Sequence, residues 1–365
     1  MLKKTILGAA LATLMALPAW AQTQIAVVGP LTGSNAAYGE QMKAGATMAV
    51  ADINKAGGVL GKPLVLNVGD DACDPKQAVS VANQMATKKV ALVAGHYCSG
   101  SSIPASKVYL EEGVLQISPA STNPAYTDKG GWGTFRTCGR DDQQGLIAGQ
   151  YLAKHFKGQK IAILHDNSAY GKGLADETKK AMNAAGQKET SFDAYTPGEK
   201  DYSAVVSRLK QAGITVIYVG GYHTEAALIV KQAKAQGMKA TLVGGDALVT
   251  KEFWQIAGPA GEGTLMTFSP DPRKNAAAAK VVKAFTDAKI DPEGYVLYTY
   301  ATVQIWAAAA KKANTTDPKK VAAMLKSGGP WQSVVGPISF DKKGDVTSGA
   351  YVMYNWNAKG DYNQM

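Results

Sequence analysis

Residues that carry most enzyme and metal chemistry are scarce in this sequence, which has three cysteines and four histidines among 365 residues. The histidines are not at metal-ligand spacing, and no phosphate loop (G-x-x-x-x-G-K-[ST]), nucleophile elbow (G-x-S-x-G) or zinc helix (H-E-x-x-H) occurs. His165 and His223 fall at the ends of predicted strands, where a catalytic base could stand, but no activated nucleophile accompanies them. We therefore expect no enzyme activity, no cofactor and no metal site.

Long hydrophobic runs are also scarce, and the longest lies at the amino terminus. Lys3 and Lys4 precede an apolar stretch over residues 6–17, and a Pro-Ala-Trp-Ala segment ending at Ala21 follows it. This order is typical of a secretory signal peptide, here residues 1–21. The stretch is shorter than the roughly 20 apolar residues that cross a bilayer, and no cysteine follows that could carry a lipid. We predict cleavage after Ala21 and release into the periplasm.

Basic residues outnumber acidic ones, but the excess is spread out. The chain has 39 lysines and arginines against 29 acidic residues, a net charge of +10; without Lys3 and Lys4 the balance is 37 against 29, or +8. The lysines are distributed over predicted helix faces, with no compact arginine-rich block and no recognition-helix motif. Such a distribution is typical of solvated helix surfaces. We therefore expect no nucleic-acid partner.

The three cysteines, Cys73, Cys98 and Cys138, are compatible with one disulfide and one odd thiol in an exported chain. Their spacing alone leaves the pairing open. A bond between Cys73 and Cys98 would close a loop of about 25 residues. In the chain-entropy description, such a loop contributes roughly 3 to 4 kcal/mol of stability.

From residue 24 onward, short β-branched runs alternate with longer amphipathic segments. The predicted strands are 25–28, 64–68, 90–93, 114–117, 161–164, 189–195, 216–219 and 241–244. The predicted helices are 39–57, 75–87, 101–112, 141–156, 171–185, 202–212 and 224–236, and alanine runs at 276–279 and 307–310 fit helix interiors. Gly186, Gly213 and Gly237 follow helices, where glycine adopts the left-handed cap. Repeated βα units predict an α/β fold with two layers, each a parallel sheet covered by helices.

Several motifs stand together in this alternating pattern, and any one alone would be a weak signal. They are ADIN at 51–54 with GG at 57–58, DDACDPKQAV at 70–79, GHYCS at 95–99, SPAST at 118–122, YG at 170–171, GEKDY at 198–202 and GGYH at 220–223. With these motifs, the sequence resembles the leucine/isoleucine/valine-binding proteins of branched-chain amino-acid ABC importers. The resemblance covers essentially the whole mature chain.

The resemblance implies the type I periplasmic binding protein fold, with two Rossmann-like lobes of parallel sheet joined by a three-strand hinge. Lobe 1 would comprise residues 22–140 and 269–350, and lobe 2 residues 141–268 and 351–365. The family's disulfide falls on Cys73 and Cys98 of this sequence. Cys138 would then be a free thiol, for which we have no role.

The ligand of such a protein would be an amino acid, whose two charges and side chain need separate partners. By family correspondence, Ser99 would bind the carboxylate beside the predicted helix 101–112, whose amide groups suit an anion; an ordinary N-cap serine is the alternative. The Ala120 carbonyl and Thr122 follow the strand 114–117, where α/β sheets receive ligands. The alternative is that these residues only form an ordinary polar turn and do not contact a ligand.

Asp246 occupies the position from which the family binds the ligand ammonium. The usual family residue there is glutamate, so this chain departs from the pattern by one methylene group. The cleft could close further, a water could bridge, or the ligand could differ. An aspartate in an ordinary turn after Gly244-Gly245 is the alternative.

Tyrosines supply the expected walls of the site. Tyr38 and Tyr170 precede glycines in predicted loops, Tyr222 follows the strand 216–219, and Tyr295 precedes a predicted helix. A tyrosine offers an apolar face to a ligand while its hydroxyl stays hydrogen-bonded. Tyr97, through its backbone, and Asp141, near the first crossing, are weaker candidates.

The leading hypothesis is a monomeric solute-binding protein that captures an aliphatic or branched-chain amino acid and delivers it to ABC permease subunits in the inner membrane. Hinge closure would follow the differential affinity of the ligand for the closed state. A second hypothesis is a ligand sensor of the same fold, for amides, urea or aromatic acids, that signals to a receptor. An enzyme of similar fold is the third, and the missing catalytic set argues against it.

Overall fold

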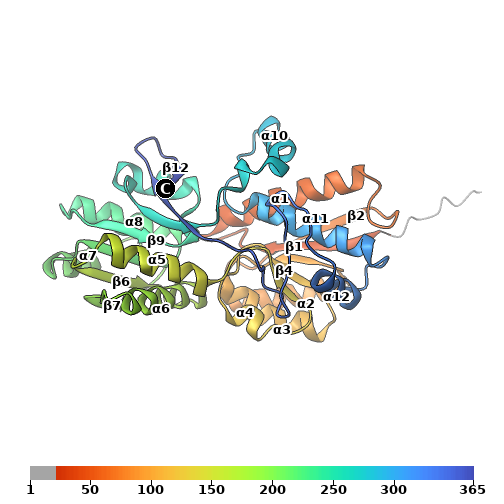
Figure 1. The fold of residues 1–365 in the computed structure, drawn as a ribbon, viewed down its shortest axis with the longest axis horizontal. Helices are drawn as coiled ribbons and strands as arrows, with labels where there is room; N and C mark the ends of the chain where they lie inside the picture. Colours follow the sequence, from red (N-terminus) through yellow and green to blue (C-terminus); the bar gives the residue numbers. More distant parts are fainter. Residues whose placement is uncertain (1–21) are drawn as a thin grey trace, which may run out of the picture.

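A computed structural model of the protein describes residues 22–365. The predicted signal peptide, residues 1–21, and its cleavage after Ala21 lie outside the described residues. Within residues 22–365, no helix has both the length and the apolar character that crossing a bilayer requires. The described chain is elongated, with two sheet-containing halves arranged along its long axis (Figure 1).

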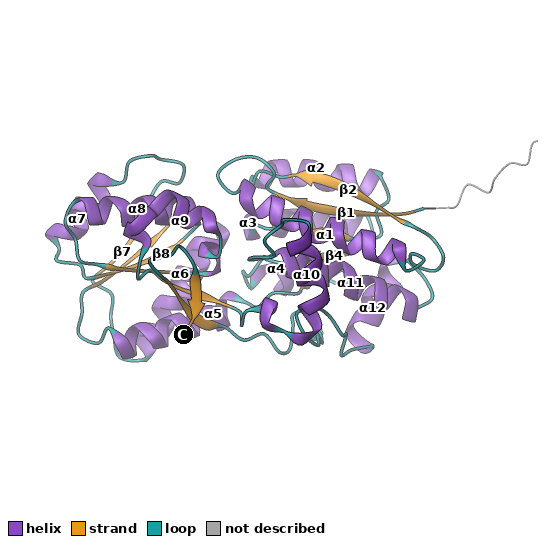
Figure 2. Ribbon diagram, turned by 90° about the horizontal axis from the view of Figure 1, so that it is seen from above, coloured by secondary structure: helices purple, strands orange, loops and turns teal. Residues whose placement is uncertain are grey.

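The first half is built on a parallel sheet of five strands in the order β2-β1-β3-β4-β5. The strands are β1 (Thr23–Gly29), β2 (Leu64–Asp70), β3 (Val93–Gly95), β4 (Gln116–Ser118) and β5 (Thr134–Arg136). Its helices are α1 (Ala36–Lys55), α2 (Pro75–Thr87), α3 (Ser99–Glu111), α4 (Ala125–Asp128), α10 (Ala279–Asp287), α11 (Val296–Lys312) and α12 (Pro318–Ser327). Figure 2 shows these helices on both sides of the strands.

The second half contains a seven-stranded sheet in the order β12-β11-β10-β9-β8-β6-β7. Its strands are β6 (Ile161–His165), β7 (Ser191–Ala194), β8 (Val216–Gly220), β9 (Thr241–Gly244), β10 (Leu265–Phe268), β11 (Val352–Trp356) and β12 (Tyr362–Gln364). Its helices are α5 (Asp141–His155), α6 (Ala169–Ala184), α7 (Ser203–Gln211), α8 (His223–Ala235) and α9 (Lys251–Ala257). The strands from β6 to β10 pair in parallel, as predicted, and the carboxy-terminal strands extend this sheet with β11 antiparallel to β10 and β12 antiparallel to β11.

Local sequence sets where the helices begin and end. Asp74 caps α2 by accepting from the backbone N–H groups of Lys76 and Gln77, at 2.9 and 2.7 Å, and Pro75 opens the helix. Ser168 caps α6 in the same way, through Gly171 N–H at 2.8 Å. The left-handed glycines predicted after three helices are confirmed, with φ values of +87° (Gly186), +69° (Gly213) and +75° (Gly237).

The strand predicted at 90–93 and the helix interior predicted at 276–279 differ from the structure. The strand expected at 90–93 follows β1 at its start, where Ala91 N–H donates to the Gln24 carbonyl at 2.8 Å, but the regular ladder begins only at Val93 and runs to Gly95. The alanine run 276–279 is not a helix interior: Asn275 caps a 3₁₀ turn (Ala276–Ala278), and α10 starts at Ala279. Pairing with β1 sets the bounds of the strand in the first case. In the second, the Asn275 cap outweighs the helix propensity of the alanines. The run 307–310 does lie inside α11.

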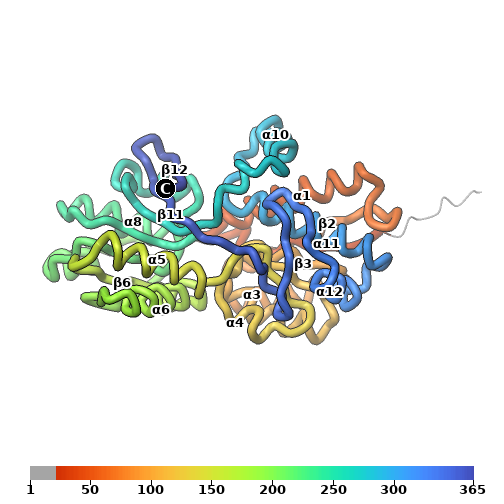
Figure 3. Tube along the Cα trace, viewed as in Figure 1, coloured from red at the N-terminus to blue at the C-terminus, as the bar shows by residue number. Residues whose placement is uncertain are grey.

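The chain passes between the two halves three times. Residues 137–140 lead from β5 to α5, the segment after β10 leads back, and the segment before β11 returns. Figure 3 shows this last passage as the dark blue tube running from the first half to β11. Arg140 Nη1 donates to Asp345 Oδ2 at 2.7 Å, which ties the first crossing to the segment before the third. Residues that directly follow β3, β4, β8 and β9 line one cavity, so the carboxyl ends of these strands face one another across the junction.

Candidate ligand-binding site

A small cavity lies between these strand ends, at the junction of the two halves. It is lined by Tyr97, Ser99, Ala120, Tyr170, Tyr222, Asp246, Ala247 and Tyr295. Seven of the nine residues predicted to bind ligand are in this set, and the other two, Tyr38 and Thr122, are buried beside it. Its volume is about 10 Å³, roughly the space that one water molecule needs. The structure is therefore a closed form, with the two halves in contact across the site.

Asp246 is the only charged side chain that lines this cavity within the described residues, and it lies at the start of a 3₁₀ turn (Asp246–Leu248) after β9. Its carboxylate accepts from Tyr295 at 2.5 Å, Tyr170 at 2.8 Å and Gln144 Nε2 at 2.9 Å. Burial raises the pKa of Asp246, and these three hydrogen bonds act in the opposite direction. Three fixed donors therefore orient the carboxylate inside the closed site.

The tyrosines form one connected cluster around Asp246. The Tyr38 and Tyr97 rings stack with centroids 4.3 Å apart, Tyr97 meets Tyr295 edge-on at 5.3 Å, and Tyr170 lies 5.2 Å from Tyr222. Burial raises the pKa of each of these hydroxyls, so they remain hydrogen-bond donors. The site is thus walled by aromatic faces with polar edges.

The placement of Tyr38 and Tyr170 in loops was wrong. Both lie in the first turns of helices, Tyr38 in α1 and Tyr170 in α6, because the glycines that follow them are helical. A Cβ on Gly39 would come within 1.9 Å of the Pro30 carbonyl oxygen, so glycine is needed for α1 to approach the loop after β1. Tyr222 and Tyr295 are where they were predicted, directly before α8 and α11.

Ser99 is the first residue of α3, and the helix begins two residues earlier than predicted. Its side chain is buried, and its Oγ accepts from Asn123 N–H at 3.2 Å. The first amide groups of a helix have no acceptor within the helix and carry partial positive charge. This end of the cavity therefore suits a negative group, opposite in character to Asp246.

The loop after β4 carries Ala120 and Thr122, and a buried arginine holds it in place. Arg136 Nη1 donates to the Ser121 carbonyl at 2.6 Å and Nη2 to the Asn123 carbonyl at 3.0 Å, on either side of Thr122. Its Nε donates to Asp345 Oδ1 at 2.7 Å. The guanidinium therefore fixes the backbone of the loop on both sides of Thr122.

Sequence reasoning missed Arg136, Gln144 and Ala247. A signal existed for Gln144: it lies three residues after Asp141 and four before Ala148, on the face of α5 that is buried. A polar residue on such a face needs a partner, and Gln144 has Asp246. For Ala247 we find no sequence signal, because its contribution is a backbone carbonyl.

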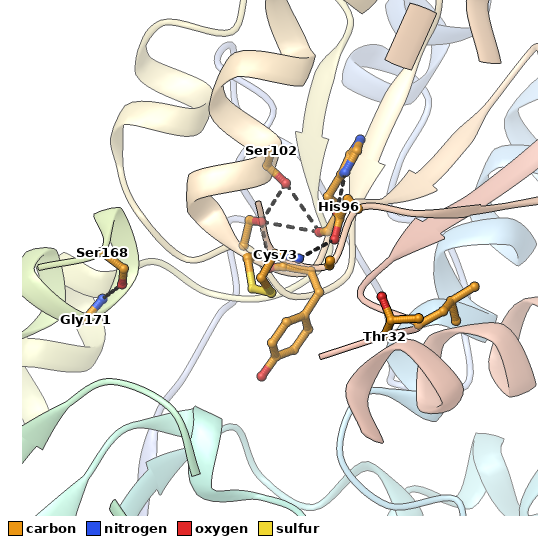
Figure 4. The surroundings of a disulfide bond; sticks show 12 residues. Thr32, Cys73, His96, Ser102, Ser168 and Gly171 are labelled. Carbon is orange, nitrogen blue, oxygen red and sulfur yellow. Dashed lines mark hydrogen bonds and ion pairs between the residues drawn. A yellow bond between two sulfur atoms is a disulfide. The ribbon is translucent and has the colours of Figure 1, made fainter. Parts of the chain in front are cut away.

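The disulfide between Cys73 and Cys98 is confirmed, with Cα atoms 5.5 Å apart, and Cys138 is free and buried. The bond joins the chain after β2 to the residue that precedes α3, so it anchors Ser99 and Tyr97. Figure 4 shows it beside His96 and Ser102, facing Ser168 and Gly171 of the other half. The Ser102 hydroxyl donates to the His96 carbonyl at 3.3 Å, and His96 Nδ1 is 2.5 Å from Asp71 Oδ2.

Comparison with known proteins identifies the family of this chain. Residues 22–361 match the family described as periplasmic binding protein. A Leu/Ile/Val-binding protein homolog 1 of Brucella suis is 52% identical over 367 aligned residues, which cover 99% of each chain. The chain belongs to the periplasmic binding protein family. This membership confirms the resemblance drawn from the motifs. Members of the family are substrate-binding proteins rather than enzymes.

Solved structures of this family share the fold over most of the chain. The leucine binding protein LivK of Thermotoga maritima aligns with a TM-score of 0.87 and 25% identity, over 94% of this chain and 97% of that one. The branched-chain amino acid transporter substrate binding protein LivJ of Streptococcus pneumoniae, solved in complex with isoleucine, aligns with a TM-score of 0.85 and 28% identity, over 94% and 99%. The predicted fold class is therefore confirmed.

Proposed function

We propose that this protein captures an aliphatic α-amino acid, of the branched-chain kind (Leu, Ile or Val), and delivers it to the permease subunits of an ABC importer. The observation that carries the proposal is Asp246, a buried carboxylate set among tyrosines across a closed site from Ser99 and the start of α3. The same ligand class is supported by the relatives: one is named a Leu/Ile/Val-binding protein homolog, one a leucine binding protein, and one was solved with isoleucine bound.

Each part of the ligand has a partner in this arrangement. The ammonium group meets Asp246, the Ala120 carbonyl and the Thr122 hydroxyl. The carboxylate meets Ser99 and the first amides of α3. Tyr38, Tyr97, Tyr170, Tyr222 and Tyr295 enclose the side chain.

A cavity of about 10 Å³ cannot admit such a ligand, so the two halves must separate before binding. We propose lobes of residues 22–140 with 269–350 and of residues 141–268 with 351–365, and a hinge formed by the three crossings between them. Hinge closure of this kind is an established form of ligand capture.

Membership of the family supports a periplasmic location. We propose export by the signal peptide 1–21 with cleavage after Ala21, and a monomeric protein. Size-exclusion chromatography with light scattering, and mass determination of the mature amino terminus, test these two points.

The first experiment is a thermal-shift screen of ligand-stripped protein against amino acids, short amides, urea and aromatic acids. A ligand at 100 times its Kd stabilises the folded protein by about 2.7 kcal/mol. We expect stabilisation by leucine, isoleucine or valine that is lost in Asp246→Ala. A response confined to amides, urea or aromatic acids would support the sensor hypothesis and remove the amino-acid assignment.

A further inference from the structure

Asp141 is a buried carboxylate that accepts no well-formed hydrogen bond in the closed structure. It is the first residue of α5, at the end of the first crossing, and its side chain is fully enclosed. Within residues 22–365 neither carboxylate oxygen meets the usual distance and angle limits for a hydrogen bond, and the Thr122 hydroxyl is the neighbouring donor that acts on it. An enclosed carboxylate without partners is strongly disfavoured in its charged form, so it becomes neutral or meets a cation.

Two neighbouring polar atoms are in the same situation. Thr122 Oγ1 and Gln144 Oε1 are buried and have no partner in the described part of the chain. Asp141 N–H donates to the Thr122 carbonyl at 2.9 Å, which places the carboxylate beside this loop. Gln144 lies one helical turn from Asp141 and uses its amide N–H groups on Asp246 at 2.9 Å and Thr267 at 2.8 Å. All the unpaired atoms can accept hydrogen bonds, so the cluster is complementary to a cation.

The charges around Asp141 do not neutralise it. Burial raises the pKa of Asp141 and Asp246 raises it further, while the Thr122 hydroxyl and Arg136 lower it and Asp142 raises it. The other titratable groups that face Asp141 are Cys138, Tyr170, Tyr218, Tyr222 and Tyr351. Arg136, the basic group with the largest effect on Asp141, already bonds Asp345 and the two loop carbonyls.

We infer that Asp141 is a positioning residue of the ammonium subsite. Its carboxylate accepts a hydrogen bond from the Thr122 hydroxyl, and this bond turns the lone pairs of Thr122 Oγ1 toward the ligand. This inference rests on the proposed function. In the resulting chain of hydrogen bonds, the ligand ammonium donates to Thr122 Oγ1 and the Thr122 hydroxyl donates to an Asp141 carboxylate oxygen. Both residues then have partners, and hydrogen bonds in such chains strengthen one another. Thr122 then serves the ammonium and not the ligand carboxylate.

This arrangement restricts the ligand class. Two carboxylates, Asp141 and Asp246, act on one subsite, so binding requires a free, positively charged amino group. Amino acids acylated on nitrogen, and carboxylic acids that lack the amine, would leave both carboxylates without a counter-charge. We therefore expect leucine to bind and N-acetylleucine and 4-methylpentanoate to be rejected.

The decisive variant is Asp141→Asn, which keeps the shape and removes the acid. At pH 7.5 we expect the Tm of the ligand-free variant to be higher by about 2 °C or more, because the buried acid no longer has to be neutralised. Below about pH 4 both states of the wild type are protonated and the two Tm values should converge. Leucine should bind about tenfold or more weakly, the loss expected for a charge-assisted hydrogen bond. A residue with a purely structural role would lower Tm and affinity together.

Calorimetry in buffers of different ionisation enthalpy gives an independent readout. Closure changes the protonation of Glu293 in both proteins, so the readout is the difference between them: on binding leucine the wild type should release more protons, or take up fewer, than Asp141→Asn. The Thr122→Val/Asp141→Asn double variant should bind leucine within twofold of the Thr122→Val single variant, because Asp141 acts through the Thr122 hydroxyl. If Asp141→Asn does not fold, Thr122→Val alone should already lower the number of protons released.

The control is Asp142→Asn, the neighbouring acid on the same helix turn, whose side chain is partly exposed and bonded to Arg140. It should change the affinity less than twofold and should not raise Tm. If the wild type binds leucine but Asp141→Asn binds it equally well with equal proton release, the inference is overturned. If the wild type binds no α-amino acid, the proposed function itself is wrong.

Discussion

The Tyr38 hydroxyl donates to the Ala247 carbonyl at 2.6 Å, a hydrogen bond between residues 209 positions apart in the chain. Tyr38 belongs to α1 in the first half, and Ala247 follows β9 in the second. Tyr295 makes a second such link when it donates to Asp246 at 2.5 Å. The closed form is therefore held partly by bonds of the protein itself. A ligand then has to supply only the remaining difference between the open and closed states.

Replacing Tyr38 by phenylalanine removes the first link but keeps the ring stacked on Tyr97. The Ala247 carbonyl loses its partner in the closed form, which costs about 1 to 1.5 kcal/mol. We expect leucine to bind roughly fivefold to tenfold more weakly, mainly through faster release. Stopped-flow fluorescence and calorimetry measure the two quantities.

Tyr300→Phe is the matched control for this substitution. The Tyr300 hydroxyl donates to Asp52 at 2.8 Å, and both residues lie in the first half. Its loss should lower the free energy of unfolding and leave the release rate of leucine unchanged. Equal release rates for Tyr38→Phe and wild type would show that the Tyr38 bond does not stabilise closure.

Periodicity located the strand and helix ends at which several residues of the cleft stand, and the assignment of these residues to the ligand came from the family resemblance. Ser99, Ala120 and Tyr222 are examples, since each follows a strand or opens a helix. Asp246 required the family resemblance, because an aspartate after two glycines is also an ordinary turn. The pairing of Cys73 with Cys98 likewise came from the resemblance, since three cysteines leave the choice open.

The parts that were missed depend on contacts between residues far apart in the chain. Arg136 bonds Asp345, 209 residues later, and its burial cannot be deduced from its neighbours in β5. The reversal at β11 depends on the direction from which the last crossing arrives. No local pattern encodes that direction, because an isolated strand looks the same in either orientation.

Glu293 predicts a pH dependence of closure. Its carboxylate, in the first half, accepts from Lys251 N–H at 3.2 Å and from Thr250 Oγ1 at 3.4 Å, both in the second half, and from Gln41 at 3.5 Å. Burial raises the pKa of Glu293 to about 7; Asp291 also raises it, while the Lys251 N–H bond and the charges of Lys251 and Arg273 lower it. Opening exposes Glu293 and returns its pKa toward the ordinary value, so closure takes up a proton.

The sign of the effect follows from this raised pKa. Below about pH 4.5 Glu293 is protonated in both forms, and closure carries no penalty from this group. The penalty grows as the pH rises toward 7 and is constant above that value. We expect Glu293→Gln to bind leucine like the wild type at pH 4 and more tightly than the wild type at pH 8. A ratio of the two Kd values that does not change between these pH values would contradict the role assigned to Glu293.

Cys138 should be chemically silent in the native protein. Burial raises the pKa of the Cys138 thiol, and little of its surface is accessible. Because the thiolate is the reactive form, we expect no reaction with Ellman's reagent under native conditions and one thiol per chain after unfolding without a reductant. Two or three reactive thiols in that unfolded sample would mean that Cys73 and Cys98 are not bonded in the purified protein.

The disulfide should contribute to stability and to the position of Ser99. It closes a loop with a sequence separation of 25 residues, so its loss in the Cys73→Ser/Cys98→Ser double variant should lower the free energy of unfolding by about 3 kcal/mol. Urea denaturation measures this loss, and reduction of the wild type should reproduce it. Because Cys98 directly precedes α3, the double variant should also bind leucine more weakly at temperatures where it remains folded. An unchanged affinity in the folded double variant would show that α3 is held by its own packing, and that the disulfide serves stability alone.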